Sequence, residues 1–223
     1  MPHNPQARSD TSVADRLIEA AESLYGRHGL EGVSLRQISI AAGTGNNYAV
    51  QYHFGDAGGL IRAILMRRMP EVELKMAQLL ARAKAAGRLA DTRTLVELLL
   101  RPVFEHVNSR GERACARFLL TLLSAPAGGQ YFASVLDQIP ISDHIFDLLN
   151  AANPDIPLAF LRERQRLVTI MVLNSIFNRY PPYHREEFEP ALLENALDMA
   201  SAALTAPVRE GVRTMLRHTS GTP

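Results

Sequence analysis

A segment near the N-terminus, residues 34–54, constrains the fold of this chain more than any other part of it. The segment reads SLRQISIAAGTGNNYAVQYHF. Ser34 and Gln37 have the spacing of a capping box, which predicts that a helix begins at this point. Gly43 is the expected end of that helix, because glycine adopts a left-handed conformation without steric cost. The pattern therefore predicts two short helices joined by a glycine turn.

The second helix of the pair is expected to begin between Gly45 and Asn47. Asn46 or Asn47 can cap it, because asparagine is a preferred N-cap residue. Only one of the two can be the cap, which leaves the other available to pair with the edge of an adenine. The residues do not decide which asparagine has which role. A helix-turn-helix unit of this kind can enter the major groove of double-stranded DNA.

The whole N-terminal block resembles the TetR family of transcriptional regulators. The resemblance rests on short motifs in one order, namely SLYGRHG (23–29), GVSLRQI (32–38), AAG (41–43), QYHF (51–54) and GLI (59–61). It implies an all-α fold with a three-helix helix-turn-helix DNA-binding domain over residues 1–55. A helical-bundle domain for ligand binding and dimerisation is expected over residues 56–206. The C-terminal tail, 207–223, is expected to be partly disordered.

Three features depart from the family's usual pattern. This chain has one residue more than is common between Ala42 and Phe54, and Gln51 stands where a tyrosine is usual. Ala57 occupies the place of a frequent lysine that touches phosphate. The family's DNA contacts therefore transfer only loosely to these positions.

Charge gives little support for DNA binding. Residues 1–55 carry four arginines and five acidic residues, so no basic patch is visible in the sequence. Arg36 and the backbone amides near Ser34 and Asn46 are still expected to face phosphates. The predicted DNA-binding residues are Ser34, Arg36, Thr44, Asn46, Asn47, Tyr48, Gln51, Tyr52 and His53. Of these, residues 46–48 are expected to choose the DNA sequence, whereas Arg36 and residues 51–53 contact phosphate or pack.

Helical patterns continue through the rest of the chain. The first helix is expected at about 12–28. Asp56 is expected to cap a long helix, which Pro70 kinks or interrupts. After a polar break at 87–91, a capping box at Thr94 and Glu97 predicts a further helix. Others are expected at about 112–124, 129–138, 142–152, 158–180 and 187–205. The chain ends, 1–9 and 218–223, are expected to be disordered.

The helices predicted at 158–180 and 187–205 are apolar over more than one face, so each must be buried on more than one side. They can be core helices of a larger bundle. Alternatively, they form a hairpin across Pro181 and Pro182 that also packs on its copy in a second subunit. The resemblance favours this homodimer, because TetR-like regulators dimerise through a four-helix bundle of their last helices. Its predicted interface residues are Leu161, Val168, Val172, Leu193, Leu197, Ala200 and Leu204.

The middle of the chain is expected to hold a pocket for a small-molecule effector, because the family senses such molecules there. Aromatic side chains can wall an apolar pocket, and arginine or histidine can anchor a polar group. The predicted ligand-binding residues are Arg101, Phe104, His106, Arg117, Phe118, Tyr131, Phe132 and Phe146. The aromatic residues among them have an ordinary alternative as core residues. The sequence does not name the ligand.

The sequence contains no pattern that predicts an enzyme, a metal site or a cofactor site. The seven histidines are scattered, and no His-Glu-x-x-His pattern, nucleophile elbow or phosphate-binding glycine loop occurs. Cys115 is the single cysteine, so the chain has no internal disulfide. No apolar run has the length of a membrane span and no signal segment is visible, which favours a cytoplasmic protein.

Two functions of different classes follow from these arguments. The first is a ligand-responsive transcriptional regulator, most simply a repressor, that binds palindromic operator DNA as a homodimer. The second is an all-helical small-molecule carrier or interaction protein that does not bind DNA. The first requires outward polar groups on the second helix of the pair, and in the second those groups are dispensable.

Overall fold

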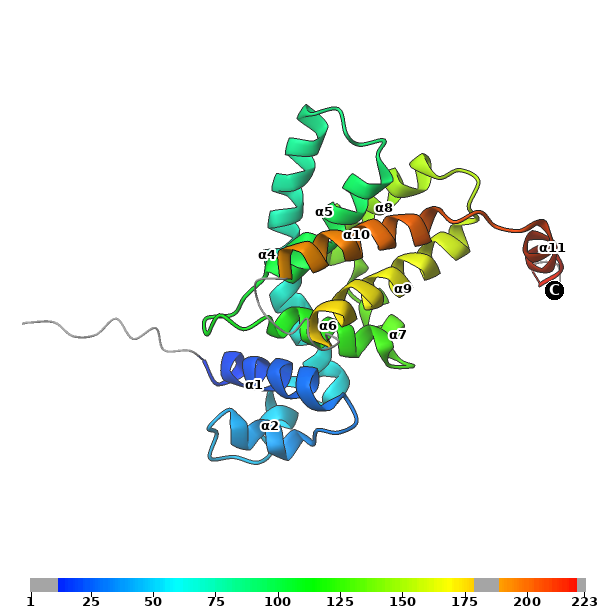
Figure 1. The fold of residues 1–223 in the computed structure, drawn as a ribbon. Coiled ribbons are helices and arrows are strands. Elements are labelled where there is room, and N and C mark those ends of the chain that lie inside the picture. Colours follow the sequence, from blue (N-terminus) through cyan, green and yellow to red (C-terminus); the bar gives the residue numbers. More distant parts are fainter. Residues whose placement is uncertain (1–11, 179–188, 220–223) are drawn as a thin grey trace, which may run out of the picture. The chain divides into compact units, whose positions relative to one another are not determined.

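The structure of the protein, a computed structural model, describes residues 12–178 and 189–219. Within these residues it consists of helices without a strand, which confirms the predicted all-α fold (Figure 1). The helices are α1 (Val13–His28), α2 (Leu35–Ala41), α3 (Ala49–Phe54), α4 (Ala57–Ala85), α5 (Thr92–Glu105), α6 (Ala114–Ser124), α7 (Gly128–Ala133), the 3-10 helix η1 (Leu136–Gln138), α8 (Pro140–Ala152), α9 (Leu158–Phe177), α10 (Glu189–Thr205) and α11 (Glu210–Thr219). The predicted disorder of 1–9 and the predicted turn at Pro181 and Pro182 lie outside the described residues.

The chain divides into two compact units. Unit 1 contains residues 1–69 and 108–135, and unit 2 contains residues 70–107 and 136–223. This division differs from the predicted boundary after residue 55, because α6 packs against α1 and so belongs with the helix-turn-helix. α4 runs through Pro70 without interruption, although the two units divide there. None of the described helices combines the length and the apolar character that crossing a membrane requires.

Local sequence signals set several helix ends as predicted. The capping box of α2 is formed in both directions, since Gln37 N donates to Ser34 Oγ and Ser34 N donates to Gln37 Oε1. Asp56 stabilises the start of α4, where its Oδ1 accepts a hydrogen bond of 2.7 Å from the amide of Gly59. Gly43 has a φ of +66°, the left-handed conformation expected after α2.

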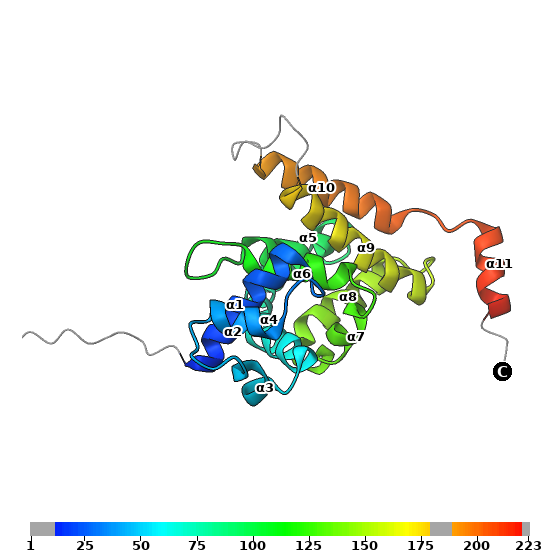
Figure 2. The ribbon, with the colours of Figure 1, turned by 90° about the horizontal axis from the view of Figure 1, so that it is seen from below.

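Two helix predictions need correction. The cap of α5 is Asp91, whose carboxylate accepts from the amides of Arg93 and Thr94, so Thr94 lies within the first turn instead of before it. Residues 210–219 form α11, where a partly disordered tail was predicted. In both views α11 stands apart from α9 and α10 at the end of an extended segment (Figures 1 and 2). Its apolar residues Val212 and Met215 are exposed.

In unit 1, α1 packs against α2 and α6 (Figure 1). Its backbone comes close to α6 at Gly26, where a Cβ atom would lie 3.2 Å from the backbone nitrogen of Phe118. A buried ion pair joins α1 to α4, because Arg68 donates to both carboxylate oxygens of Glu22 at 2.8 to 3.0 Å. Their exposed fractions are only 7% and 1%, respectively. These contacts hold together α1, α4 and α6, and α2 packs against α1.

In unit 2, α9 and α10 pack side by side, and α5 packs against α8, α9 and α10 (Figure 2). The first turn of α8 is capped from α4. The buried carboxylate of Glu73 accepts from the amide of Ile141 at 2.7 Å and from the amide of Ser142 at 2.9 Å. The hydroxyl of Ser142 also donates to Glu73. Glu73 therefore satisfies amides that have no partner within α8 itself.

Candidate nucleic-acid interface

The turn between α2 and α3 is held by short polar side chains. The Thr44 hydroxyl donates to the carbonyl oxygens of Ser39 and Asn46, at 2.9 and 3.0 Å. Asn46 Oδ1 accepts from the amide of Tyr48 at 2.8 Å. The amide of Ala49 in turn donates to the Asn46 carbonyl at 3.2 Å, so this turn leads directly into α3. The backbone at the start of α3 is therefore fixed by the protein's own hydrogen bonds.

The two adjacent asparagines differ in their contacts. Asn46 uses its side-chain oxygen to close the turn, as a capping residue does. The Asn47 side chain is exposed and makes no hydrogen bond within residues 12–178 and 189–219. α3 begins at Ala49, later than predicted, because the turn closed by Asn46 comes before the helix. Asn47 is thus the asparagine whose amide remains available to an external partner.

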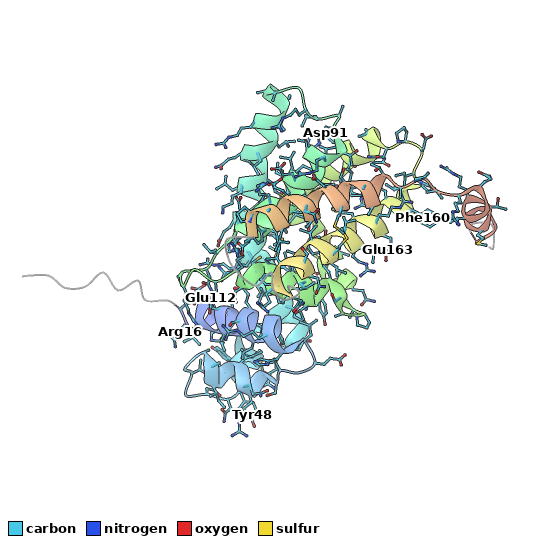
Figure 3. The ribbon with its side chains drawn as sticks, in the orientation of Figure 1. Arg16, Tyr48, Asp91, Glu112, Phe160 and Glu163 are labelled. Atoms are coloured by element: carbon cyan, nitrogen blue, oxygen red, sulfur yellow. The ribbon has the colours of Figure 1, made fainter. Side chains whose placement is uncertain are left out.

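The short helix α3 and the turn before it bury small apolar residues and expose polar and aromatic ones. Ala49 and Val50 are buried, with exposed fractions of 4% and 0%. Tyr48 and Tyr52 are exposed by 70% and 83%. Gln51 is exposed as well. Figure 3 shows Tyr48 at the outer edge of unit 1, beyond α2.

The other predicted DNA-binding residues have several different roles in the structure. Ser34 belongs to the capping box, and Thr44 holds the turn. Arg36 is exposed and has no ion pair within the described part of the chain. His53 is exposed, and its ring lies edge-on to the ring of Tyr52 with centroids 5.0 Å apart. Arg62 on α4, which the sequence analysis did not select, is likewise exposed and without an ion pair among the described residues.

The predicted ligand-binding residues fall into both units. Arg117, Phe118, Tyr131 and Phe132 belong to unit 1, and Arg101, Phe104, His106 and Phe146 belong to unit 2. Several of them have partners within the protein. Arg101 donates to Glu97 and Glu194, His106 Nε2 lies 2.8 Å from Glu71 Oε2, and the Arg162 guanidinium lies 4.0 Å from the ring centre of Phe146. Their role in binding a ligand stays a prediction.

Tyr25 on α1 is a buried polar residue that the sequence analysis did not select. It is 1% exposed, and its hydroxyl has no hydrogen-bond partner within the described residues. Burial raises the pKa of Tyr25 to about 12, with a smaller contribution from Tyr131. A buried hydroxyl of this kind normally has a hydrogen-bond partner, so the missing partner of Tyr25 is an exception among the described residues of unit 1. Its apolar surroundings on an amphipathic helix gave no sign of this in the sequence.

The predicted dimer-interface residues lie in the core of the protomer. Their exposed fractions are at most 4%: Leu161 0%, Val168 4%, Val172 0%, Leu193 3%, Leu197 0%, Ala200 0% and Leu204 1%. The pattern identified the buried stripes of α9 and α10, but within the chain these stripes already pack on each other and on α5. The surfaces that α9 and α10 leave available include Leu167 and Met199, which are 49% and 52% exposed.

The fold places the chain in a structural class. No protein-family model matches the sequence, and no curated protein matches it either. A solved structure is similar: the crystal structure of the TetR family transcriptional regulator PfmR from Thermus thermophilus. The TM-score is 0.50 and the sequence identity 18%, over 90% of this chain and 100% of the other. The protein therefore has a TetR-like all-helical fold.

Proposed function

We propose that this chain is a ligand-responsive transcriptional regulator, acting as a repressor, that binds palindromic operator DNA. The observation that carries the proposal is the surface of α3. Asn47, Tyr48, Gln51 and Tyr52 are exposed, and their polar groups have no hydrogen bonds within the described residues, although the backbone beneath them is fixed. Because the backbone is already ordered, binding has to order only the side chains, and such side chains at the start of a recognition helix can read base edges.

Selection from a pool of random DNA duplexes tests the proposal. Full-length protein is incubated with the pool at low and at moderate salt, and bound duplexes are amplified and sequenced. We expect a palindromic sequence to be enriched. Absence of enrichment at low salt would overturn the proposal, because even non-specific binding is strongest there.

The proposed regulator is a homodimer that associates through α9 and α10. Leu167 and Met199 supply exposed apolar surface on these helices, and Ala202 and Ala203 are small exposed residues that allow close approach. A two-fold dimer presents two copies of α3, which matches two half-sites of a palindrome. Light scattering at micromolar protein concentration tests this part, and a monomer would contradict it.

The proposed effector is an apolar or amphipathic small molecule that lowers the affinity for operator DNA. Support comes from the aromatic residues of α6 and α7, which belong to the same unit as α3, and from the buried hydroxyl of Tyr25. Reciprocal linkage requires operator DNA to weaken ligand binding by the same factor. A thermal-shift screen followed by DNA titration tests this. Stabilising ligands that all leave DNA affinity unchanged would contradict it.

One observation favours a different function, that of an all-helical carrier or interaction protein. No lysine or arginine occurs between Gln37 and Ile61, so the recognition segment itself contributes no permanent positive charge toward phosphates. The duplex selection separates the two functions. A carrier would show a ligand-induced thermal shift and no enriched DNA.

A further inference from the structure

The side chains displayed at α3 belong to chemical types that recognise A·T base pairs. Asn47 and Gln51 are four residues apart, and so are Tyr48 and Tyr52. The amide of Tyr52 donates to the carbonyl of Tyr48 at 3.0 Å, so the helical turn already includes Tyr48. Residues four apart lie on the same side of a helix. Tyr48 and Tyr52 therefore lie on the same side of the segment, while Gln51 lies on α3 and Asn47 lies in the turn just before it.

The side-chain amides of Asn47 and Gln51 suit adenine. Asparagine and glutamine both form paired hydrogen bonds with the N6 and N7 atoms of adenine in the major groove. Both amides are exposed and have no hydrogen bond within the described residues, whereas the neighbouring Asn46 is already engaged by the amide of Tyr48. The segment therefore exposes two adenine-reading groups, one in the turn before α3 and one on α3 itself.

The rings of Tyr48 and Tyr52 suit thymine. Thymine is the base that projects a methyl group into the major groove, and apolar and aromatic side chains contact it there. Tyr48 and Tyr52 are 70% and 83% exposed, so both rings are accessible to a thymine methyl group. One A·T base pair therefore presents an adenine edge to a side-chain amide and a thymine methyl group to a neighbouring tyrosine ring.

Guanine lacks its usual reader at this surface. The commonest specific contact to guanine is a bidentate arginine or lysine, and none occurs from Gln37 to Ile61. His53 is exposed at the end of α3 and can donate to a single guanine acceptor, but its ring already packs edge-on against Tyr52. The nearest exposed arginine before the turn, Arg36, lies on α2 and not on the recognition helix.

We propose that α3 reads a run of A·T base pairs, with Asn47 and Gln51 on adenines and Tyr48 and Tyr52 on thymine methyl groups. This inference rests on the proposed function, because it names the DNA sequence class of the same site. It also assigns Gln51 and Tyr52 to base reading, in place of the phosphate contacts or packing that the sequence predicted.

The duplex selection gives the first test, and its outcomes separate the two proposals. An enriched palindrome with invariant A·T pairs in each half-site is expected. An enriched palindrome whose invariant positions are G·C pairs would overturn the A·T inference and leave the DNA-binding proposal standing. No enrichment at all would overturn the DNA-binding proposal, and the A·T inference with it.

A chemical double-mutant cycle gives the second test. Each invariant thymine of the selected operator is replaced by uracil, which removes only the methyl group. We expect one or two positions at which the wild-type affinity falls about fourfold, the value for one buried methyl-sized group. With Tyr52→Ala or Tyr48→Ala protein, uracil at the matching position should cause no further loss. An equal loss in wild type and both variants would show that neither ring touches a thymine methyl.

A change of specificity completes the test. Asn47→Arg and Gln51→Arg introduce the guanine-reading group at one position each. Each should shift the preferred base pair at one operator position from A·T to G·C by at least about tenfold. Arg36→Ala is the matched control, which should weaken binding to all sequences alike. Arginine variants that gain affinity equally for every duplex would show a charge effect alone and would overturn the assignment.

Discussion

Polar side chains differ in their contacts between two surfaces of the molecule, the proposed recognition face of α3 and the face where α5 meets α10. On α5, Arg93 donates to Glu97, Glu194 and Asp198, and Arg101 donates to Glu97 and Glu194. At α3, exposed amides and phenols have no such partners among the described residues. Polar groups that are satisfied within the chain stabilise it, and polar groups left exposed on a fixed backbone are available for recognition.

Among polar groups that have partners within the chain, the largest loss of stability is expected on removing one member of the buried ion pair between α1 and α4. Glu22→Gln leaves the guanidinium of Arg68 buried without its carboxylate, which should lower the free energy of unfolding by about 3 to 5 kcal/mol. Urea denaturation measures this. Glu163→Gln, which breaks the exposed pair with Arg166, is the matched control and should cost less than about 1 kcal/mol. Equal losses would show that the buried pair has no special role.

The next effect concerns the outer face of α9 and α10. Met199→Asp should raise the dimer dissociation constant by about a hundredfold or more, because the new charge would be buried between subunits, and it should leave the protomer folded. Sedimentation or light scattering measures the mass, and circular dichroism checks the fold. Leu74→Asp on α4, at a residue exposed by 62%, is the matched control and should remain dimeric. Leu197→Asp should instead unfold the protomer, because Leu197 is fully buried.

Asn46 and Asn47 allow the same comparison within a single turn, because Asn46 has a hydrogen-bond partner within the chain and the Asn47 side chain has none among the described residues. Asn46→Ala removes the acceptor for the Tyr48 amide and should lower the free energy of unfolding by about 1 kcal/mol. Asn47→Ala should leave stability unchanged and reduce the ratio of specific to non-specific DNA affinity by about tenfold or more. Thermal unfolding and binding titrations on operator and scrambled duplexes measure the two effects. The reverse pattern would exchange the roles of the two residues.

The smallest expected effect is a pH dependence at the α5–α10 face. The hydrogen bond from Arg101 holds the pKa of Glu194 below its usual 4.5. Because the pKa is lower in the folded state, the stabilisation is present above about pH 4.5 and is lost as pH falls through the folded-state pKa. Solvent screens this half-exposed group, so Glu194→Gln should remove only about 0.5 kcal/mol of the acid-dependent stability. Parallel stability curves for the variant and the wild type between pH 3 and pH 5 would contradict this.

Much of the fold could be predicted from the sequence, because local signals determine helix ends. The Ser34 and Gln37 box, the cap by Asp56 and the stop at Gly43 each depend on residues within a few positions. The cap of α5 was misassigned because Asp91 and Thr94 are both good caps, and only the three-dimensional structure shows which one the helix uses. The membership of α6 in unit 1 depends on packing against α1, which no local pattern reveals.

The candidate site was predictable in composition but not in detail. The sequence indicated that one of the two asparagines would cap, yet the choice depends on the turn geometry that places Asn46 Oδ1 against the Tyr48 amide. The residues predicted for a dimer interface on α9 and α10 are buried within the chain itself, because periodicity shows that a stripe is buried and does not show what covers it. Leu167 and Met199 are exposed apolar residues outside the buried stripes of these helices. A periodic pattern does not identify single apolar residues of this kind.

The cap that Glu73 provides for α8 has a consequence for the order of folding. Ile139, the residue before α8, has no side chain that caps the helix, and the carboxylate that serves the first amides lies 68 residues earlier than Ile141. Bringing such distant segments together costs loop-closure entropy before any hydrogen bond forms. We therefore expect α8 to acquire a stable first turn only after α4 has formed and docked, so the chain completes this part of unit 2 late.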